Sequence, residues 1–120
     1  MAALMLMTAP AWAEWVLLTS SNDDSIYIDS TPTPVIDSVV KAWMLIDLKK
    51  RAPAGYFSIR ILDEYQCQEG KYRHLSASTH SERMAGGRII AFDKEPGAWR
   101  TVVSGTANGE ILKRICPTDE

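Results

Sequence analysis

The stretch Tyr56-Phe57-Ser58-Ile59-Arg60-Ile61-Leu62-Asp63-Glu64-Tyr65-Gln66-Cys67 decides the fold of this chain. Its odd positions are mainly apolar and its even positions mainly polar, apart from a break at Leu62 and Asp63. A period of two is typical of a strand with one buried face and one solvated face. The strand ends in one of the two cysteines, and the other, Cys116, ends a helical pattern near the C-terminus. A bond between Cys67 and Cys116 would therefore fasten a C-terminal helix to the sheet.

Further strands are predicted on both sides of this stretch, because β-branched and aromatic residues recur between turn-forming segments. They span residues 14–19, 25–29, 39–48, 71–81, 88–92 and 98–103. The segment 39–48 has a wholly apolar even face and a partly apolar odd face, so we expect it to be a central strand covered on both sides. From Thr106, a candidate N-cap, the period changes to that of a helix. Its apolar stripe consists of Ala107, Ile111, Leu112, Ile115 and Cys116.

These patterns predict an α+β fold, in which an antiparallel meander of about six strands carries one C-terminal helix on a face. The chain of 120 residues has room for a single core, so we expect one domain over residues 14–120. The net charge of −2 gives no long-range positive field. Nucleic acid and anionic membranes are therefore poor candidate partners.

Residues 1–13 form a short apolar run that ends in Ala11-Trp12-Ala13, the small-residue pattern of a signal-peptidase site. We predict cleavage between Ala13 and Glu14, although the usual positively charged start of a signal peptide is missing. An N-terminal strand or a frayed tail is the alternative. The run is too short to span a bilayer, and no cysteine follows the cut, so we expect no lipid anchor there. Export to the periplasm or beyond would oxidise a cysteine pair to a disulfide.

A catalytic interpretation would make Cys67 a nucleophile and His74 its base. The disulfide with Cys116 is favoured over it, because both cysteines end apolar stripes of an exported chain. His74 and His80 are six residues apart on one predicted strand, which is roughly 20 Å, so they cannot share a metal ion and we expect surface histidines. The pair Asp23-Asp24 lacks the ligand series of a calcium loop. We predict no catalytic set, no metal and no cofactor.

The remaining polar residues of the sheet have two interpretations. Cross-strand ion pairs are expected among the charged residues, and a polar recognition face is the alternative; the residues are Arg60, Glu64, Arg73, Glu82 and Arg83. Asp63 lies on the apolar side, so either the strand shifts there or the carboxylate meets a partner such as an arginine. Trp15, Trp43 and Trp99 are predicted to pack in the core rather than to form a ligand platform. Exposed sheet edges could pair between two chains and give a homodimer.

The order of these features resembles the surface adhesin protein E family of Gram-negative bacteria over nearly the whole of residues 14–120. The matching features include a Tyr27-x-Asp29 strand, Val40 to Asp47, Ser58 to Cys67, Trp99-Arg100-Thr101-Val102 and Ile111-Leu112-x-x-Ile115-Cys116. The resemblance implies an antiparallel sheet joined by a disulfide to a C-terminal helix. It also implies binding of extracellular proteins by a lipid-anchored, dimeric surface protein, although this chain lacks the anchoring cysteine.

We therefore expect an exported, non-enzymatic binding domain of the periplasm or envelope whose partner is an envelope or extracellular protein. The sequence does not identify that ligand. A small periplasmic hydrolase, a thiol-redox protein and a purely structural envelope component are the alternatives.

Overall fold

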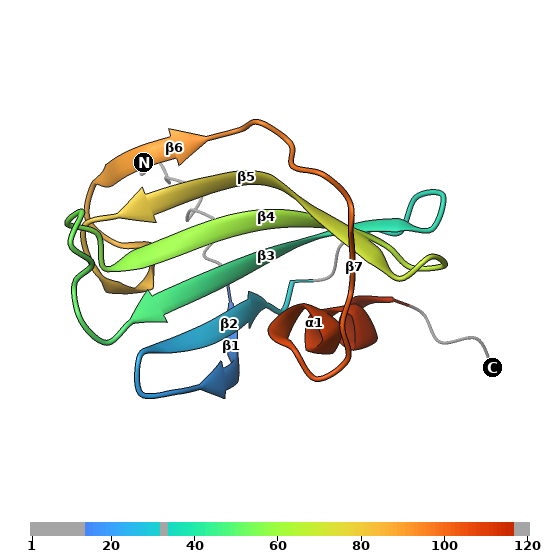
Figure 1. Ribbon diagram of the computed structural model, residues 1–120, viewed down its shortest axis with the longest axis horizontal. Helices are drawn as coiled ribbons and strands as arrows, with labels where there is room; N and C mark the ends of the chain where they lie inside the picture. The colour runs from blue at the N-terminus through green and yellow to red at the C-terminus, as the bar shows by residue number, and fades with distance from the viewer. Residues whose placement is uncertain (1–13, 32–33, 117–120) are drawn as a thin grey trace, which may run out of the picture.

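The computed structural model describes residues 14–31 and 34–116, and its main element is one antiparallel sheet (Figure 1). The strands follow the chain in the order β1-β2-β3-β4-β5-β6, with a short β7 also paired to β5. Their bounds are β1 Trp15–Ser20, β2 Asp24–Asp29, β3 Val39–Leu48, β4 Ser58–Gln66, β5 Lys71–His80, β6 Ile89–Asp93 and β7 Arg100–Thr101. The predicted meander is confirmed. The strand expected at 98–103 is reduced to the two residues of β7.

The helix α1, Ala107–Ile115, lies across one face of this sheet (Figure 1). Ile111 is fully buried and packs with side chains from β2, β3 and β4, which together form the core: Ile28, Ala42, Met44, Ile61 and Tyr65. Leu112 and Ile115 pack against the edge of this cluster, as the predicted stripe requires. We call this side of the sheet the helix face.

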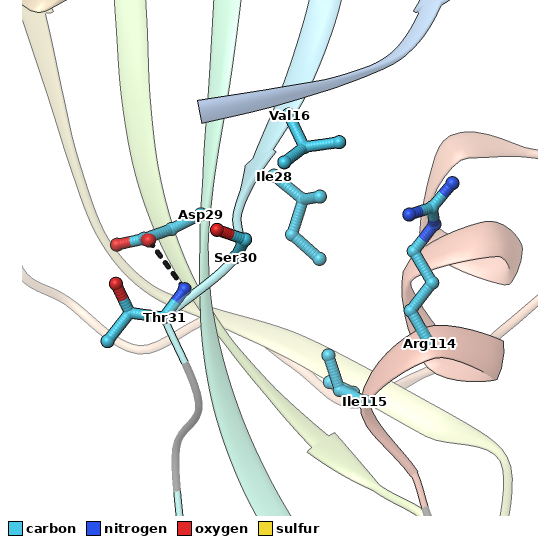
Figure 2. A pocket seen from close by; sticks show the side chains of 7 residues that line it. All are labelled: Val16, Ile28, Asp29, Ser30, Thr31, Arg114 and Ile115. Atoms are coloured by element: carbon cyan, nitrogen blue, oxygen red, sulfur yellow. Dashed lines mark hydrogen bonds between the residues drawn. The ribbon is translucent and has the colours of Figure 1, made fainter. Parts of the chain in front are cut away.

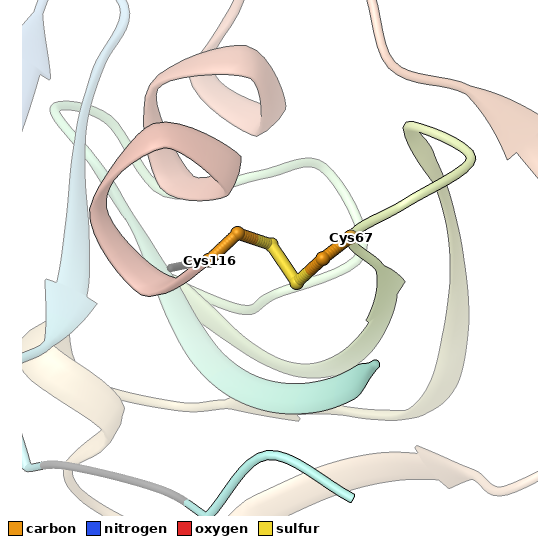
Figure 3. Close-up of a disulfide and its surroundings, with 2 residues drawn as sticks. All are labelled: Cys67 and Cys116. Atoms are coloured by element: carbon orange, nitrogen blue, oxygen red, sulfur yellow. A yellow bond between two sulfur atoms is a disulfide. The ribbon is translucent and has the colours of Figure 1, made fainter. Parts of the chain in front are cut away.

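Both ends of α1 are fixed. Thr106 is the N-cap, as predicted, because its hydroxyl accepts a hydrogen bond from the Gly109 nitrogen at 3.1 Å. The Cys67–Cys116 disulfide is confirmed, with 5.6 Å between the two Cα atoms (Figure 3). It joins the residue after β4 to the residue after α1.

Gly109 is explained by close packing at the start of α1. A Cβ atom added there would lie 2.6 Å from the Val103 carbonyl oxygen and 3.3 Å from the Ser104 Cα. Glycine costs about 1 kcal/mol of helix propensity relative to alanine, but it lets the helix approach the preceding backbone.

The face opposite α1 is only partly covered by residues 14–31 and 34–116, which corrects the expectation that β3 is covered on both sides. A 3₁₀ turn, η1 (Arg83–Ala85), packs against one end of β3 and β4. Leu45 and Asp47 are buried in that region, whereas Lys41 is exposed and Trp43 half-buried at the other end of β3. We call this side of the sheet the open face.

Candidate functional site

The open face is built from alternate residues of β3 and β4, which the strand register places side by side. Lys41 pairs with Glu64, Trp43 with Leu62, Leu45 with Arg60 and Asp47 with Ser58. Because side chains alternate along a strand, these residues point away from Ala42, Met44 and Ile61 of the helix face.

At one end of the open face, polar groups hold η1 in place. The Asp47 carboxylate accepts hydrogen bonds from the Met84 nitrogen at 2.7 Å and from Arg83 Nε at 3.2 Å. Ser58 Oγ accepts from the Ala85 nitrogen at 2.9 Å. Met84 and Ala85 have φ angles of 55° and 60°, a left-handed conformation that is uncommon for residues other than glycine. These hydrogen bonds offset that strain and hold η1 against β3 and β4, so η1 covers this end of the open face.

The other end of the open face is hollowed into a groove of about 580 Å³. Its lining is mainly apolar and consists of Pro34, Ile36, Asp37, Val39, Lys41, Trp43, Leu62 and Glu64. One wall is a tight turn, because Ile36 and Val39 exchange two backbone hydrogen bonds of 2.9 Å. Asp37 and Ser38 in this turn have positive φ angles of 54° and 63°. The turn leaves Ile36 65 % exposed beside the groove.

Two tryptophan–arginine contacts lie on and beside this face. The Arg60 guanidinium lies 3.7 Å from the centre of the Trp43 ring, and Arg73 lies 4.5 Å from that of Trp99. Burial lowers the pKa of Arg60, although the Asp29 carboxylate opposes this shift. Arg73 also pairs with Glu64 at 2.9 Å, so one predicted cross-strand ion pair is present. The other predicted partners go elsewhere: Arg83 pairs with Asp47 at 3.1 Å and Glu82 with Arg51 at 3.9 Å.

These contacts correct the prediction that the tryptophans pack in the core. Trp15, Trp43 and Trp99 are all half-buried, and the buried core cluster contains none of them. Tyr65 is the large aromatic side chain of the core instead, with no exposed area. Trp43 thus contributes an aromatic wall to the groove.

A polar cluster on the helix face links the sheet to the first turn of α1. Asp63 is 1 % exposed, and its carboxylate lies 2.5 Å from His74 Nδ1 and 3.4 Å from Asn108 Nδ2. Asn108 also donates to the Tyr65 hydroxyl at 2.8 Å. Burial raises the pKa of both Asp63 and Tyr65. Both alternatives expected for Asp63 are found, because the β4–β5 register shifts between Leu62 and Asp63 and the carboxylate has a partner, which is His74.

The Asp63–His74 pair resembles part of a catalytic triad, in which a carboxylate orients an imidazole. A triad also needs a nucleophile beside the imidazole. In the part of the chain that the structure describes, no serine hydroxyl or cysteine sulfur hydrogen-bonds His74, and Cys67 is bonded to Cys116. The cluster therefore acts as a polar link between the helix and the sheet.

His80 corrects the expectation of two surface histidines. It is only 6 % exposed, whereas the His74 side chain is 44 % exposed. His80 Nε2 lies 2.7 Å from Ser78 Oγ, and its buried Nδ1 has no hydrogen-bond partner among the described residues. Within residues 14–31 and 34–116, no group of three or more potential ligands could hold a metal ion.

Two of the buried titratable groups, His80 and Asp63, give stability opposite dependences on pH. Burial, assisted by the positive charge of Arg60, lowers the pKa of His80 below 6.5. Between the two pKa values the unfolded state binds more protons than the folded state, so His80 destabilises the fold as the pH falls below about 6.5. The pKa of Asp63 is raised above 3.8, so this carboxyl group destabilises the fold as the pH rises from 3.8 through its folded-state pKa.

We expect His80→Gln to remove the loss of stability below about pH 6.5 and to leave the opposite trend of Asp63 visible. Urea unfolding at a series of pH values from about 3.5 to 8 measures both slopes. Asp63→Asn is the matched variant, since it should remove the loss of stability that begins as the pH rises above 3.8. An unchanged slope between about pH 5 and 6.5 in His80→Gln would contradict the assignment to His80.

A second hollow, of about 380 Å³, lies between the ends of β1 and β2 and the last turn of α1 (Figure 2). Val16, Ile28 and Ile115 give it an apolar lining, and Arg114 forms one wall. The Asp29 carboxylate turns away from Arg114 and accepts a hydrogen bond from the Thr31 nitrogen at 2.9 Å (Figure 2). Neither hollow was predicted from the sequence, since their residues come from segments distant in the chain.

The fold is that of an antiparallel sheet with the helix α1 held on one face by a disulfide, and its open face carries an aromatic groove. The family model described as surface-adhesin protein E matches residues 15–117. The chain belongs to the surface-adhesin protein E family. None of the helices formed by the described residues has the length and apolar character that a membrane crossing requires.

Solved structures of protein E from Haemophilus influenzae are similar in fold. One is 16 % identical with a TM-score of 0.66, and the match covers 91 % of this chain and 89 % of that one. Another, from a non-typeable strain, is 15 % identical with a TM-score of 0.64, and the match covers 89 % of this chain and 79 % of that one. No curated protein sequence matches the chain. At this identity the likeness concerns the fold.

Proposed function

We propose that this chain is an exported, non-enzymatic adhesin-like protein that binds a protein partner through the groove of the open face. The groove itself carries this proposal. It offers exposed apolar area at Ile36 beside half-buried Trp43 and Leu62, on the side of the sheet that α1 leaves uncovered. Tryptophan and arginine are the residues most enriched in the energetically dominant part of protein interfaces. Membership of an adhesin family supports the same conclusion.

The partner that fits this surface is a protein that inserts an apolar side chain beside the Trp43 ring. Arg60 and Arg73 are already stacked on tryptophans, so they add rigid area at little further entropic cost. The charged residues Asp37, Lys41 and Glu64 border the apolar lining and form a polar rim. We place this binding in the periplasm or outside the cell, where the disulfide is stable.

We expect Trp43→Ala to lower the association constant for a protein partner by about 30-fold or more, since central tryptophans contribute roughly 2 kcal/mol or more. The immobilised domain is tested against purified extracellular-matrix proteins and a bacterial envelope extract, and any retained protein is then titrated in pure form. Ile36→Asp is the second variant, because a 65 % exposed side chain can change without disturbing the core.

Leu17→Asp is the control, because Leu17 is 51 % exposed on β1 and does not line the groove. It should bind like the unchanged domain. The absence of any saturable partner, or equal binding by all three variants, would contradict the proposed function. Turnover of a substrate by the purified domain would favour the hydrolase alternative.

We further propose that two copies pair through β6, one of the two edge strands of the sheet. Ile89 and Phe92 are 58 % and 60 % exposed, and in the described part of the chain no strand lies on the outer side of β6. An antiparallel pairing about a twofold axis can set Ile89 opposite Phe92 of the second copy. The same register sets Arg88 opposite Asp93 twice, which makes the edge complementary to itself.

Arg88→Asp should therefore weaken the dimer, because it places two acidic side chains opposite each other at both ends of the pairing. Combining it with Asp93→Arg should restore the dimer. Sedimentation equilibrium over a range of protein concentrations measures both. Most specific dimers have dissociation constants below about 100 μM. A wild-type chain that stays monomeric at that concentration would therefore contradict the pairing.

A further inference from the structure

Glu14 begins the described chain in a defined position at the start of the edge strand β1. Its carbonyl oxygen accepts a hydrogen bond from the Ser30 nitrogen at 2.9 Å. Its nitrogen lies 3.4 Å from Asp29 Oδ1. The next residue, Trp15, is the register partner of Asp29. The first nitrogen of the domain is thus held against a carboxylate.

The Asp29 carboxylate interacts electrostatically with Arg60, but the hydrogen bonds that it accepts come from uncharged groups. Oδ1 accepts from the nitrogens of Thr31 and Glu14, both of which are neutral backbone groups. Arg114 lies across the hollow, and the Asp29 carboxylate points away from it (Figure 2). A carboxylate aimed at a chain-terminal nitrogen would interact much more strongly with an ammonium group than with an amide.

The bond that precedes this nitrogen is the predicted cleavage site, Ala13–Glu14. Its hydrolysis breaks the amide C–N bond. Water supplies hydroxyl to the Ala13 carbonyl and a proton to the Glu14 nitrogen, which takes a further proton at neutral pH because an α-amino group has a pKa of about 8.

We propose that Glu14 is the N-terminus of the processed protein and that Asp29 is the counter-ion of its new ammonium group. Cleavage thereby adds an ion pair that fastens the edge strand β1 to the end of β2. The inference rests on the export included in the proposed function. Two stabilising features then arise only after the chain has left the cytoplasm, namely this ion pair and the Cys67–Cys116 disulfide.

A four-protein cycle tests the ion pair without reference to binding. One chain begins with a free amine at Glu14, released from a fusion partner whose protease leaves no extra residue, and the other retains residues 11–13. Each of these two chains is made both with the native Asp29 and with the substitution Asp29→Asn. Urea unfolding then gives the unfolding equilibrium constant of each of the four proteins. Asp29→Asn should raise the unfolding constant in both chains, and the increase should be about two- to fivefold larger in the chain that begins at Glu14 than in the chain that retains residues 11–13. The excess should shrink in about 1 M NaCl.

Asp23→Asn is the matched control, because Asp23 is an exposed carboxylate at the other end of the same hairpin. It should show no excess. Equal effects of Asp29→Asn in the two chains would overturn the ion pair. N-terminal sequencing of the full chain recovered from the periplasm of a Gram-negative host tests the processing, and any first residue other than Glu14 would overturn it. A domain that binds no partner leaves both results unaffected.

Discussion

Replacing Cys67 and Cys116 together by serine is expected to lower the free energy of unfolding by about 4 kcal/mol. The bond closes a loop between residues 49 apart in sequence, and its removal frees that loop in the unfolded chain. Small domains are stable by only about 5–15 kcal/mol, so this loss is large. Urea unfolding of the two proteins under the same buffer conditions measures it.

Reduction of the unchanged protein with a thiol reagent is the internal control, and it should reproduce the stability of the double serine variant. The variant should also lose protection from hydrogen exchange first in α1, because the helix then depends on the Asp63 cluster and its apolar stripe alone. A loss of less than about 1 kcal/mol would contradict this account, since it would mean that packing alone fixes the helix.

The framework of the fold could be predicted because it depends on local patterns. The period of two in residues 56–67 yields β4, and the apolar stripe after Thr106 yields α1. Both are the kinds of signal that a single sequence carries well. The disulfide could be predicted because one cysteine ends a strand and the other ends a helix, and a cysteine pair in a chain predicted to be exported has few other uses.

The tryptophans were misplaced because hydrophobicity alone does not say which face of a two-sided strand is covered. On β3 the even face is wholly apolar and the odd face partly so, and Trp43 is on the odd face, which α1 leaves uncovered. An arginine stacked on an indole ring shields it from water without placing it in a core. The signal available in the sequence was Arg60 on the neighbouring strand, which was assigned to an ion pair instead.

Asp63 and His80 were incompletely predicted because their surroundings come from distant segments. The partners of Asp63 are on β5 and α1, and a register shift in β5 decides that His74 is opposite it. His80 is buried near the segment that leads into η1, where no periodic pattern marks the chain. The groove depends in the same way on the turn at Asp37 and Ser38, whose left-handed conformation the sequence does not signal.

The residues that stabilise the fold and the proposed binding surface lie on opposite sides of the sheet. The tethered helix occupies the helix face, where the core residues Ile61 and Tyr65 determine stability. The groove lies on the open face and contains residues that the core does not need, such as Ile36. Substitutions in the groove can therefore change the partner while the scaffold is preserved, which is how one fold can serve different ligands.

Ile111→Ala is expected to lower the free energy of unfolding by about 3–4 kcal/mol. The side chain has no exposed area and is the contribution of α1 to the buried core cluster of β2, β3 and β4. Its truncation leaves a cavity that the disulfide-bound helix cannot easily close, so the cost exceeds that of solvent transfer alone. Urea unfolding measures the loss, and Lys113→Ala, an exposed change on the same helix, should cost less than about 0.5 kcal/mol.

The same substitution in the double serine variant separates packing from tethering. If α1 is already partly detached without the disulfide, Ile111→Ala should cost at least about 1 kcal/mol less there than in the bonded protein, because its native contacts are no longer fully formed. Equal costs in both backgrounds would contradict this coupling and show that the helix stays docked without its covalent tether. The disulfide would then act on the unfolded chain alone, whereas the coupled result makes it a direct determinant of how α1 is seated on the sheet.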